Sequence, residues 1–182
     1  MIFSSWNCRG LASKPKKLAL KDWLLNSKAE VLLLQETLGK GLEVEIALKS
    51  LLPRWSFIAI DSTGHSGGIA IGFKEGKLKI INQWGTKHVL GLEVLSSDFP
   101  FPFSIVNVYG PCQGREVFWE DLMAKSFMKY PLLIVGGDLN FSIGRAEAWG
   151  PSAREDPLSD FFQNLMLESN LSDPSPVKLN PT

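Results

Sequence analysis

Apolar and polar segments alternate along the chain in a way that predicts strands and helices following one another, with no linker and no internal repeat. Short apolar runs bounded by Gly, Asn or Ser are typical of strands, and longer segments with one apolar face are typical of helices. The expected strands are residues 2–6, 31–35, 55–60, 68–73, 78–83, 89–95, 103–109 and 132–135. The expected helices are one that starts within residues 13–17 and continues to Leu25, followed by 42–52, 116–130 and 157–170.

This order of elements indicates the class of fold. Strand-helix-strand-helix is followed by a meander of five strands and then by helix-strand-helix. Such an order favours mixed sheets covered by helices on their outer faces, so the predicted class is α/β or α+β in layers. A chain of 182 residues is long enough to bury one sizeable core, and we expect a single domain over residues 1–182.

The composition excludes several classes of protein. Hydrophobic residues make up 45% and charged residues 21%, which is typical of a globular protein and not of a disordered one. No apolar run approaches the ~20 residues of a membrane helix, and the N-terminus lacks the pattern of a secretory signal. Two cysteines (Cys8 and Cys112) and two histidines argue against a disulfide framework and a structural zinc site. We therefore expect a reducing, intracellular setting and no membrane partner.

The charges balance over the whole chain but not along it. The chain has nineteen basic and nineteen acidic residues, so its net charge gives no indication of a broad basic surface for nucleic acid. Residues 1–40, however, contain seven basic and three acidic side chains. The cluster over residues 14–21 is interpreted as a solvated helix face, and contact with a phosphate backbone remains the alternative.

Polar residues at the ends of predicted strands are the candidates for chemistry, because ligands of open α/β sheets bind beyond the carboxyl ends of the strands. Taken one at a time, each has an ordinary explanation as a turn, cap or packing residue. Taken together, they supply the hard oxygen ligands that Mg²⁺ prefers and a phenol that can donate to phosphate. These parts suggest metal-assisted phosphodiester hydrolysis. The candidates are Asn7, Glu36, Asn107, Tyr109, Asp138 and Asn140.

Five motifs carry a resemblance to a known family. WNCRG, LLQET, SGG, VNVYGP and GGDLN, in this order and at these spacings, resemble the endonuclease/exonuclease/phosphatase superfamily. More narrowly, they and the closing stretch from residue 156 are similar to the endonuclease domain of plant LINE-type (non-LTR) retrotransposons. The resemblance implies a four-layered sandwich of two mixed β-sheets flanked by helices, with the site at the sheet edges.

The resemblance also implies roles for three residues around a metal ion. Glu36 would bind Mg²⁺, with Mn²⁺ as an alternative. Asn7 would assist the metal or the phosphate. Asp138 would position and activate the attacking water molecule.

Three further residues are expected to contact the substrate phosphate. By the same resemblance, Asn140 would contact the phosphate beside Asp138, and Tyr109 would donate to it as negative charge builds. Asn107 is expected next to Tyr109 on the same phosphate. The retrotransposon relatives nick DNA to create a primer for reverse transcription, so DNA is the expected partner. A DNA target favours a location in the nucleus, although the chain has no basic nuclear localisation signal of 5–8 residues.

The chain departs from the family's pattern at its C-terminus. Family members carry further C-terminal strands and a final Ser-Asp-His motif that is central to catalysis, so we expect a domain that is incomplete at its C-terminus. Neither His65, expected in a loop, nor His88, expected at a strand start, replaces that histidine. Two alternatives therefore stay open: a non-catalytic remnant of such a domain, or a phosphodiesterase or phosphatase with a substrate other than DNA.

Overall fold

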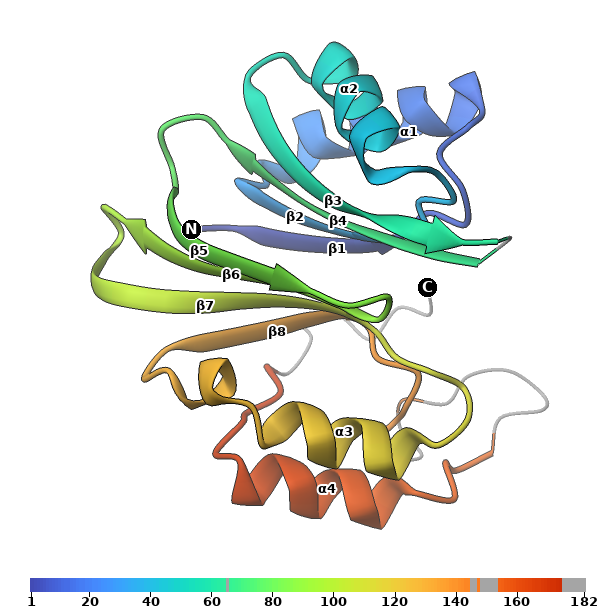
Figure 1. Cartoon of the computed structure of the whole chain (residues 1–182), viewed down its shortest axis with the longest axis vertical. Coiled ribbons are helices and arrows are strands. Elements are labelled where there is room, and N and C mark those ends of the chain that lie inside the picture. Colours follow the sequence, from blue (N-terminus) through green and yellow to red (C-terminus); the bar gives the residue numbers. More distant parts are fainter. Residues whose placement is uncertain (65, 145–146, 148–153, 175–182) are drawn as a thin grey trace. The chain divides into compact units, whose positions relative to one another are not determined.

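The chain folds as two compact units. The computed structural model describes residues 1–64, 66–144, 147 and 154–174. Unit 1 consists of Met1–Pro111 and Ser126–Leu139, and unit 2 consists of Cys112–Lys125 and Asn140–Thr182. Both β-sheets belong to unit 1 (Figure 1).

Unit 1 contains strands and helices in the order that the hydrophobic pattern predicts. Its strands are β1 (Phe3–Asn7), β2 (Val31–Gln35), β3 (Trp55–Thr63), β4 (Ser66–Lys74), β5 (Lys79–Gly85), β6 (Val89–Ser96), β7 (Phe99–Tyr109) and β8 (Leu133–Asp138). Its helices are α1 (Lys14–Ser27), α2 (Gly41–Leu51) and a short 3₁₀ helix, η1 (Ser126–Lys129). Pro15 lies in the first turn of α1, where its missing N–H has no intrahelical partner to lose.

The eight strands form two mixed sheets. The first has the order β1-β2-β4-β3 and the second the order β5-β6-β7-β8. Each sheet has one parallel pair, β1 with β2 and β7 with β8, and its other pairs are antiparallel. The expected class is thus confirmed: an α/β fold with two mixed four-stranded sheets and helices. The expectation of one domain over residues 1–182 stays a prediction.

Both faces of the first sheet are buried, and β2 shows why. Because side chains alternate along a strand, Leu32 and Leu34 pack against α1 and α2. Val31 and Leu33 point the other way, into the core between the two sheets. All four are at most 2% exposed, and burial of each contributes about 1.5–3 kcal/mol to folding. Three layers result within unit 1: helices α1 and α2, the first sheet and the second sheet (Figure 1).

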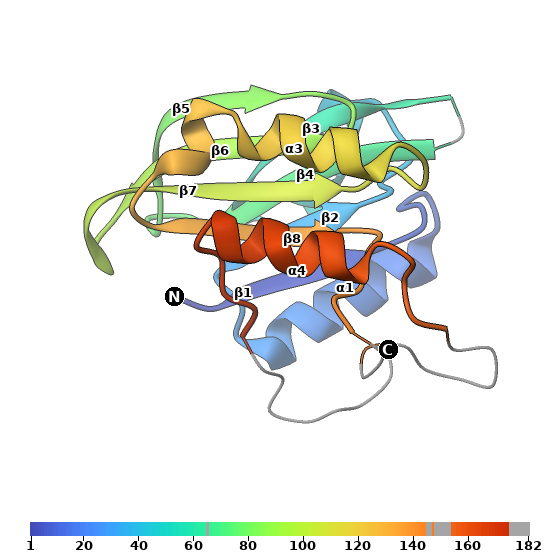
Figure 2. The same cartoon turned by 90° about the horizontal axis from the view of Figure 1, so that it is seen from below.

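Unit 2 is built around two helices, α3 (Arg115–Met123) and α4 (Ser159–Glu168). Figure 2 shows them running side by side. An aromatic cluster joins them: Trp119 of α3 meets Phe141 and Phe162 edge-on, and Phe141 and Phe162 stack with their ring centroids 4.0 Å apart.

Among the element boundaries that differ from the expected ones, those of β7, β8 and α3 differ as follows. β7 begins at Phe99, and β8 continues to Asp138, so that Asp138 is the last residue of its strand. The helix expected over residues 116–130 ends at Met123. The N–H of Lys125 bonds to the carbonyl of Leu122, a tighter 3₁₀-type bond that closes the last turn. None of the described helices is both long and apolar enough to span a membrane.

Candidate active site

Four of the predicted site residues lie at the carboxyl ends of the two parallel strand pairs. Asn7 ends β1, and Glu36 directly follows β2. Tyr109 ends β7 and pairs in register with Asp138 at the end of β8. Since each parallel pair brings two carboxyl ends to the same edge of its sheet, residues far apart in the chain meet there.

Hydrogen bonds connect these four side chains. The Asn7 amide nitrogen donates to Glu36 Oε1 at 2.8 Å and to Asp138 Oδ2 at 2.6 Å. The Tyr109 hydroxyl donates to the same Glu36 oxygen at 3.2 Å. The Asn7 amide oxygen accepts the backbone N–H of Arg9 at 3.1 Å, which turns the amide nitrogen toward the two carboxylates. The structure therefore brings Asn7, Glu36, Tyr109 and Asp138 into one cluster.

The cluster carries two carboxylates and no ion-pair partner within the described residues. The salt bridges of the described chain involve other acidic groups, and neither Glu36 nor Asp138 takes part in one. Neutral donors, an amide and a phenol, hold the two carboxylates instead. Such an arrangement leaves the negative charge available to a cation.

Glu36 has a strained backbone that its neighbours hold in place. Its φ of 54° lies in the left-handed region, which non-glycine residues rarely adopt. The carbonyl of Glu36 accepts the N–H of Gly10 at 2.7 Å, and the next N–H, that of Thr37, bonds to the carbonyl of Gly68 at 3.1 Å. Strain of this kind costs about 1–3 kcal/mol and persists only where surrounding bonds over-determine it. The WNCRG and SGG motifs thus fix Glu36 from both sides.

Two glycines allow the backbone to approach closely at this edge. Gly68 has a φ of +79°, and a Cβ there would collide with the Thr37 hydroxyl. Gly137, in the GGDLN motif, has a φ of +138°, and a Cβ would collide with the backbone of Val108 on the neighbouring strand. The carbonyl of Asp138 then accepts the N–H of Gly110 at 2.8 Å, which continues the β7–β8 pairing past Tyr109.

Asn107 requires a correction. Its side chain is 0% exposed, and its amide nitrogen donates to the backbone carbonyls of Leu34 at 3.0 Å and Ala70 at 2.9 Å. Its amide oxygen accepts from Gln35 at 2.6 Å. The predicted contact with substrate phosphate is wrong for this residue, because its polar atoms are bonded inside the protein and shielded from any ligand.

Asn140 belongs to unit 2. Its φ is 54°, and Arg115 of α3 donates to its backbone carbonyl at 2.9 Å. Arg115 also forms a two-point ion pair with Asp156, at 2.5 and 2.8 Å. The Arg115 guanidinium holds the pKa of the Asp156 carboxyl below its usual range. The role of Asn140 on the phosphate stays a prediction.

His88 lies directly before β6 and contacts Tyr109, a neighbour that sequence patterns did not indicate. Its ring Nδ1 is 3.0 Å from the backbone oxygen of Tyr109, and its own carbonyl accepts the Tyr109 N–H at 2.8 Å. The expected strand start is therefore close to its observed place. His65 lies outside the described residues.

Cys8 is 3% exposed, and its thiol donates to the carbonyl of Gln35 at 3.0 Å. Burial raises the pKa of this thiol to about 12, so it stays protonated at neutral pH. A protonated, buried thiol is a poor nucleophile and a poor metal ligand.

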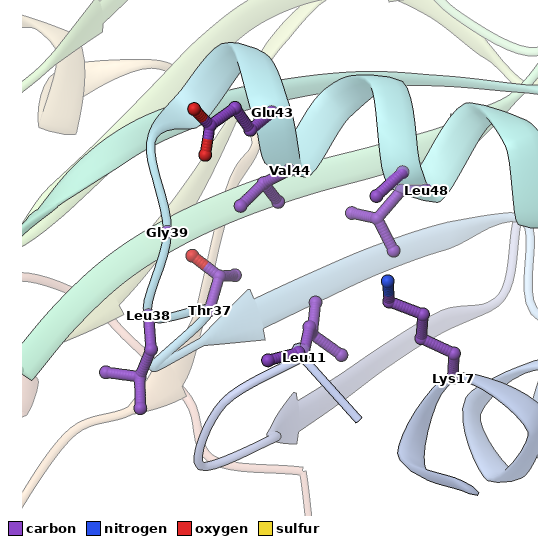
Figure 3. Close-up of a pocket in the computed structure, with 10 residues that line it drawn as sticks. Leu11, Lys17, Thr37, Leu38, Gly39, Glu43, Val44 and Leu48 are labelled. Atoms are coloured by element: carbon purple, nitrogen blue, oxygen red, sulfur yellow. The ribbon is translucent and has the colours of Figure 1, made fainter. Parts of the chain in front are cut away.

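The loop after Glu36 also borders a pocket of about 200 Å³ between α1 and α2 (Figure 3). Leu11, Val44 and Leu48 form much of its wall, with Lys17 and Glu43 as its charged lining residues. Because its wall is mostly apolar, this pocket does not offer the set of oxygen ligands found at the strand ends.

The carboxylates at the strand ends have the chemistry that a Mg²⁺ site requires. The described residues contain no cluster of three or more His, Cys, Asp or Glu side chains able to hold a metal ion. Mg²⁺, however, is commonly bound by one or two carboxylates together with water and substrate phosphate rather than by a full protein cage. The two carboxylates, joined through the Asn7 amide nitrogen, fit that pattern, because they supply the hard oxygen ligands.

The fold and the cluster together define an α/β protein with a polar, carboxylate-based site at the edge of a two-sheet sandwich. Residues 4–161 match the Endonuclease/Exonuclease/phosphatase family. The chain belongs to this family of phosphodiester hydrolases, which includes nucleases and phosphatases. No curated protein matches the chain by sequence.

Solved structures of related fold include three that act on nucleic acid according to their descriptions. A 3′-5′ exonuclease from Neisseria meningitidis has a TM-score of 0.69 at 18% identity, over 93% of this chain and 71% of that one. An AP endonuclease from Archaeoglobus fulgidus has a TM-score of 0.68 at 15% identity, over 92% and 70%. The endonuclease domain of TRAS1, a telomere-specific non-LTR retrotransposon, has a TM-score of 0.66 at 17% identity, over 92% and 71%. At such identities these similarities show the fold.

Proposed function

We propose that this chain is a divalent-metal-dependent phosphodiesterase domain of the retrotransposon endonuclease type, with DNA as its substrate. The observation that supports this most strongly is the bonding of Asn7 to both Glu36 and Asp138, which joins the ends of β1, β2 and β8. Nucleases of the family generally use a divalent metal, most often Mg²⁺. The retrotransposon endonuclease among the similar structures favours DNA over other phosphodiesters.

Glu36 would hold the metal through its carboxylate, and Asn7 would assist by donating its amide N–H groups to Glu36 and Asp138. When bound, Mg²⁺ would supply Lewis-acid stabilisation of charge on the phosphate oxygens. Asn7 holds the two carboxylates at one amide nitrogen by donating to both, and Glu36 would face the cation while Asp138 would face water. Mn²⁺ offers the same preference for oxygen ligands and is an alternative.

Asp138 would act on the attacking water molecule. A carboxylate held by one hydrogen bond from Asn7 keeps oxygen lone pairs free to orient water and to accept its proton. Tyr109 would donate its hydroxyl to the phosphate as negative charge builds, exchanging its hydrogen bond to Glu36 for one to the substrate. Asn140 would contribute its amide to the phosphate.

A plasmid-nicking assay tests this proposal. The chain is incubated with supercoiled DNA in the presence of Mg²⁺, of Mn²⁺ or of EDTA. We expect metal-dependent nicking that Asp138→Asn lowers by about 10²–10⁴-fold, the usual contribution of a general base. Asp22→Asn, on the exposed face of α1, is the matched control and should leave nicking unchanged.

Three outcomes would contradict the proposal. Nicking that persists in EDTA or in the Asp138→Asn variant would exclude the assigned chemistry. Absence of nicking, with hydrolysis of a non-nucleotide phosphodiester that Asp138→Asn abolishes, would keep the site and overturn DNA as the substrate. Absence of both would favour a non-catalytic remnant of the family.

A further inference from the structure

A pair of buried amides joins the two sheets below the candidate site. Gln35 and Asn107 are each 0% exposed, and Gln35 Nε2 donates to Asn107 Oδ1 at 2.6 Å. Gln35 also bonds to the hydroxyl of Ser5 on β1, with its Nε2 at 3.2 Å. The hydrogen-bond chain therefore runs from β1 through β2 to β7, across both sheets.

The two amides lie next to catalytic candidates in the chain. Gln35 directly precedes Glu36 at the end of β2, and Asn107 comes two residues before Tyr109 on β7. Asn107 donates to the carbonyls of Leu34 and Ala70, so a residue of the second sheet is bonded to two strands of the first. The contact between Tyr109 and Glu36 spans the same two sheets.

Elsewhere, the core between the sheets consists of apolar side chains. Its buried members are Val31, Leu33, Ile69, Ile71, Phe73, Leu90, Leu92, Val94, Phe103 and Ile105. Apolar contacts are nondirectional, and they tolerate small shifts of one sheet over the other. A buried amide pair is directional, because any shift that breaks its hydrogen bonds leaves polar atoms without partners.

We propose that Gln35 and Asn107 are positioning residues that fix the second sheet against the first, and thereby bring the Tyr109 hydroxyl to Glu36. The inference rests on the proposed function for the catalytic meaning of that contact. Whether the amide pair brings the Tyr109 hydroxyl to Glu36 can be tested without measuring any catalytic activity.

The two tyrosines of the chain make a direct measurement possible. A Tyr130→Phe background leaves Tyr109 as the single tyrosine, and ¹³Cζ labelling then gives one NMR resonance that reports on its hydroxyl. Glu36→Gln removes the charged acceptor and defines the shift that accompanies its loss. We expect Asn107→Leu, and separately Gln35→Met, to move the resonance toward this reference position.

Leu92→Ala is the matched control. Leu92 lies on β6 in the same inter-sheet core and is also 0% exposed, but it bonds to no polar group of the pair. We expect its truncation to lower the melting temperature, because it leaves a cavity in the core, and to leave the Tyr109 resonance at the unsubstituted position. A general loosening of the core therefore gives a different result from a loss of positioning.

A second variant covers the case in which a single substitution prevents folding. Gln35→Met combined with Asn107→Leu removes both partners, so neither amide is left buried and unpaired. A folded protein that lacks the pair and keeps the Tyr109 resonance at its unsubstituted position would overturn the proposal.

Nicking kinetics give an independent readout. If the unsubstituted chain nicks DNA, each positioning variant should lower kcat by about 10–100-fold with KM nearly unchanged, as expected from a small displacement of a catalytic group. An unchanged kcat in a folded variant would contradict the proposal. A chain that does not nick at all would contradict the proposed function, and the NMR result would still decide whether the amide pair positions Tyr109.

Discussion

The contacts that stabilise the interior of unit 1 differ in kind from those that stabilise the interior of unit 2. Unit 1 relies on ladders of backbone hydrogen bonds within two sheets and on two apolar cores. In unit 2, side-chain contacts join the two helices: the cluster of Trp119, Phe141 and Phe162, and the ion pair of Arg115 with Asp156. Arg115 also lies over the Phe162 ring, 5.6 Å from its centroid.

This difference separates Asn140 from the other predicted site residues. Asn7, Glu36, Tyr109 and Asp138 are placed by strand ends of unit 1, where many backbone bonds share the task. Asn140 is placed in unit 2, where Arg115 bonds to its carbonyl. We therefore expect changes in unit 2 to affect Asn140 and to spare the other four residues.

The largest expected loss of stability comes from two matched substitutions of a buried phenylalanine by alanine, one in each unit. Phe103 of β7 and Phe162 of α4 are both 0% exposed, so each substitution by Ala should cost about 3–5 kcal/mol. We expect Phe162→Ala to lower hydrogen-exchange protection over residues 115–123 and 159–168. Phe103→Ala should lower protection over β6 and β7. Mass-spectrometric hydrogen exchange measures both, and equal loss across the whole chain in either variant would show that the units open together.

The ion pair of unit 2 should make its stability depend on acidic pH. The pKa of Asp156 is lowered in the folded protein, chiefly by its hydrogen bonds to Arg115. The unfolded chain therefore takes up this proton at a higher pH than the folded one. The stabilisation is complete above the ordinary Asp pKa of about 3.9 and is lost as the pH falls through the lower, folded value.

Asp156→Asn is the variant that isolates this contribution. At pH 6 we expect it to cost about 1.5–3 kcal/mol, the range for hydrogen bonds to charged groups. The difference in melting temperature between the variant and the unsubstituted chain should shrink toward pH 2. A difference that stays constant over this range would show that packing, and not charge, accounts for the loss.

The smallest expected effect is a difference in the free energy of unfolding between alanine variants of two glycines. Gly68 lies beside the site, and Gly76 lies away from it. Gly68 and Gly76 have φ values of +79° and +80°, so alanine at either position meets the same backbone strain. Gly76 has open space around it, whereas a Cβ at Gly68 meets Thr37 and lies 3.2 Å from the N–H of Leu38. We expect Gly68→Ala to be about 1–3 kcal/mol more destabilising than Gly76→Ala, as measured by urea unfolding. Equal values would mean that the loop after Glu36 moves aside without cost.

Most elements could be predicted from the sequence because their signals are local. Val31–Gln35 is an apolar run of strand length, and the structure makes it a strand buried on both faces. The end of α3 at Met123 does not follow from the sequence, since the bond that closes its last turn depends on geometry that periodicity does not report. Asn7 and Glu36, both expected at strand ends, meet in the structure because their parallel strands share an edge, and their roles in catalysis stay predictions.

Asn107 shows where such reasoning fails. The segment SIVNVY has the same polar residue near its end that a site strand would have. Only the partners decide its role, and those partners are Gln35, Leu34 and Ala70, 37 to 73 residues away in the chain. Proximity to a site along the strand did not imply access to it.

By itself, the sequence determined the types and order of the elements, the glycines that allow tight approach, and the family motifs at the strand ends. The tertiary structure decided which polar groups meet. Asn7 and Asp138 are 131 residues apart, and they bond because two parallel strand pairs bring their ends together. Local patterns follow from the conformational preferences of neighbouring residues, whereas such a contact depends on how strands pair and sheets pack over the whole of unit 1.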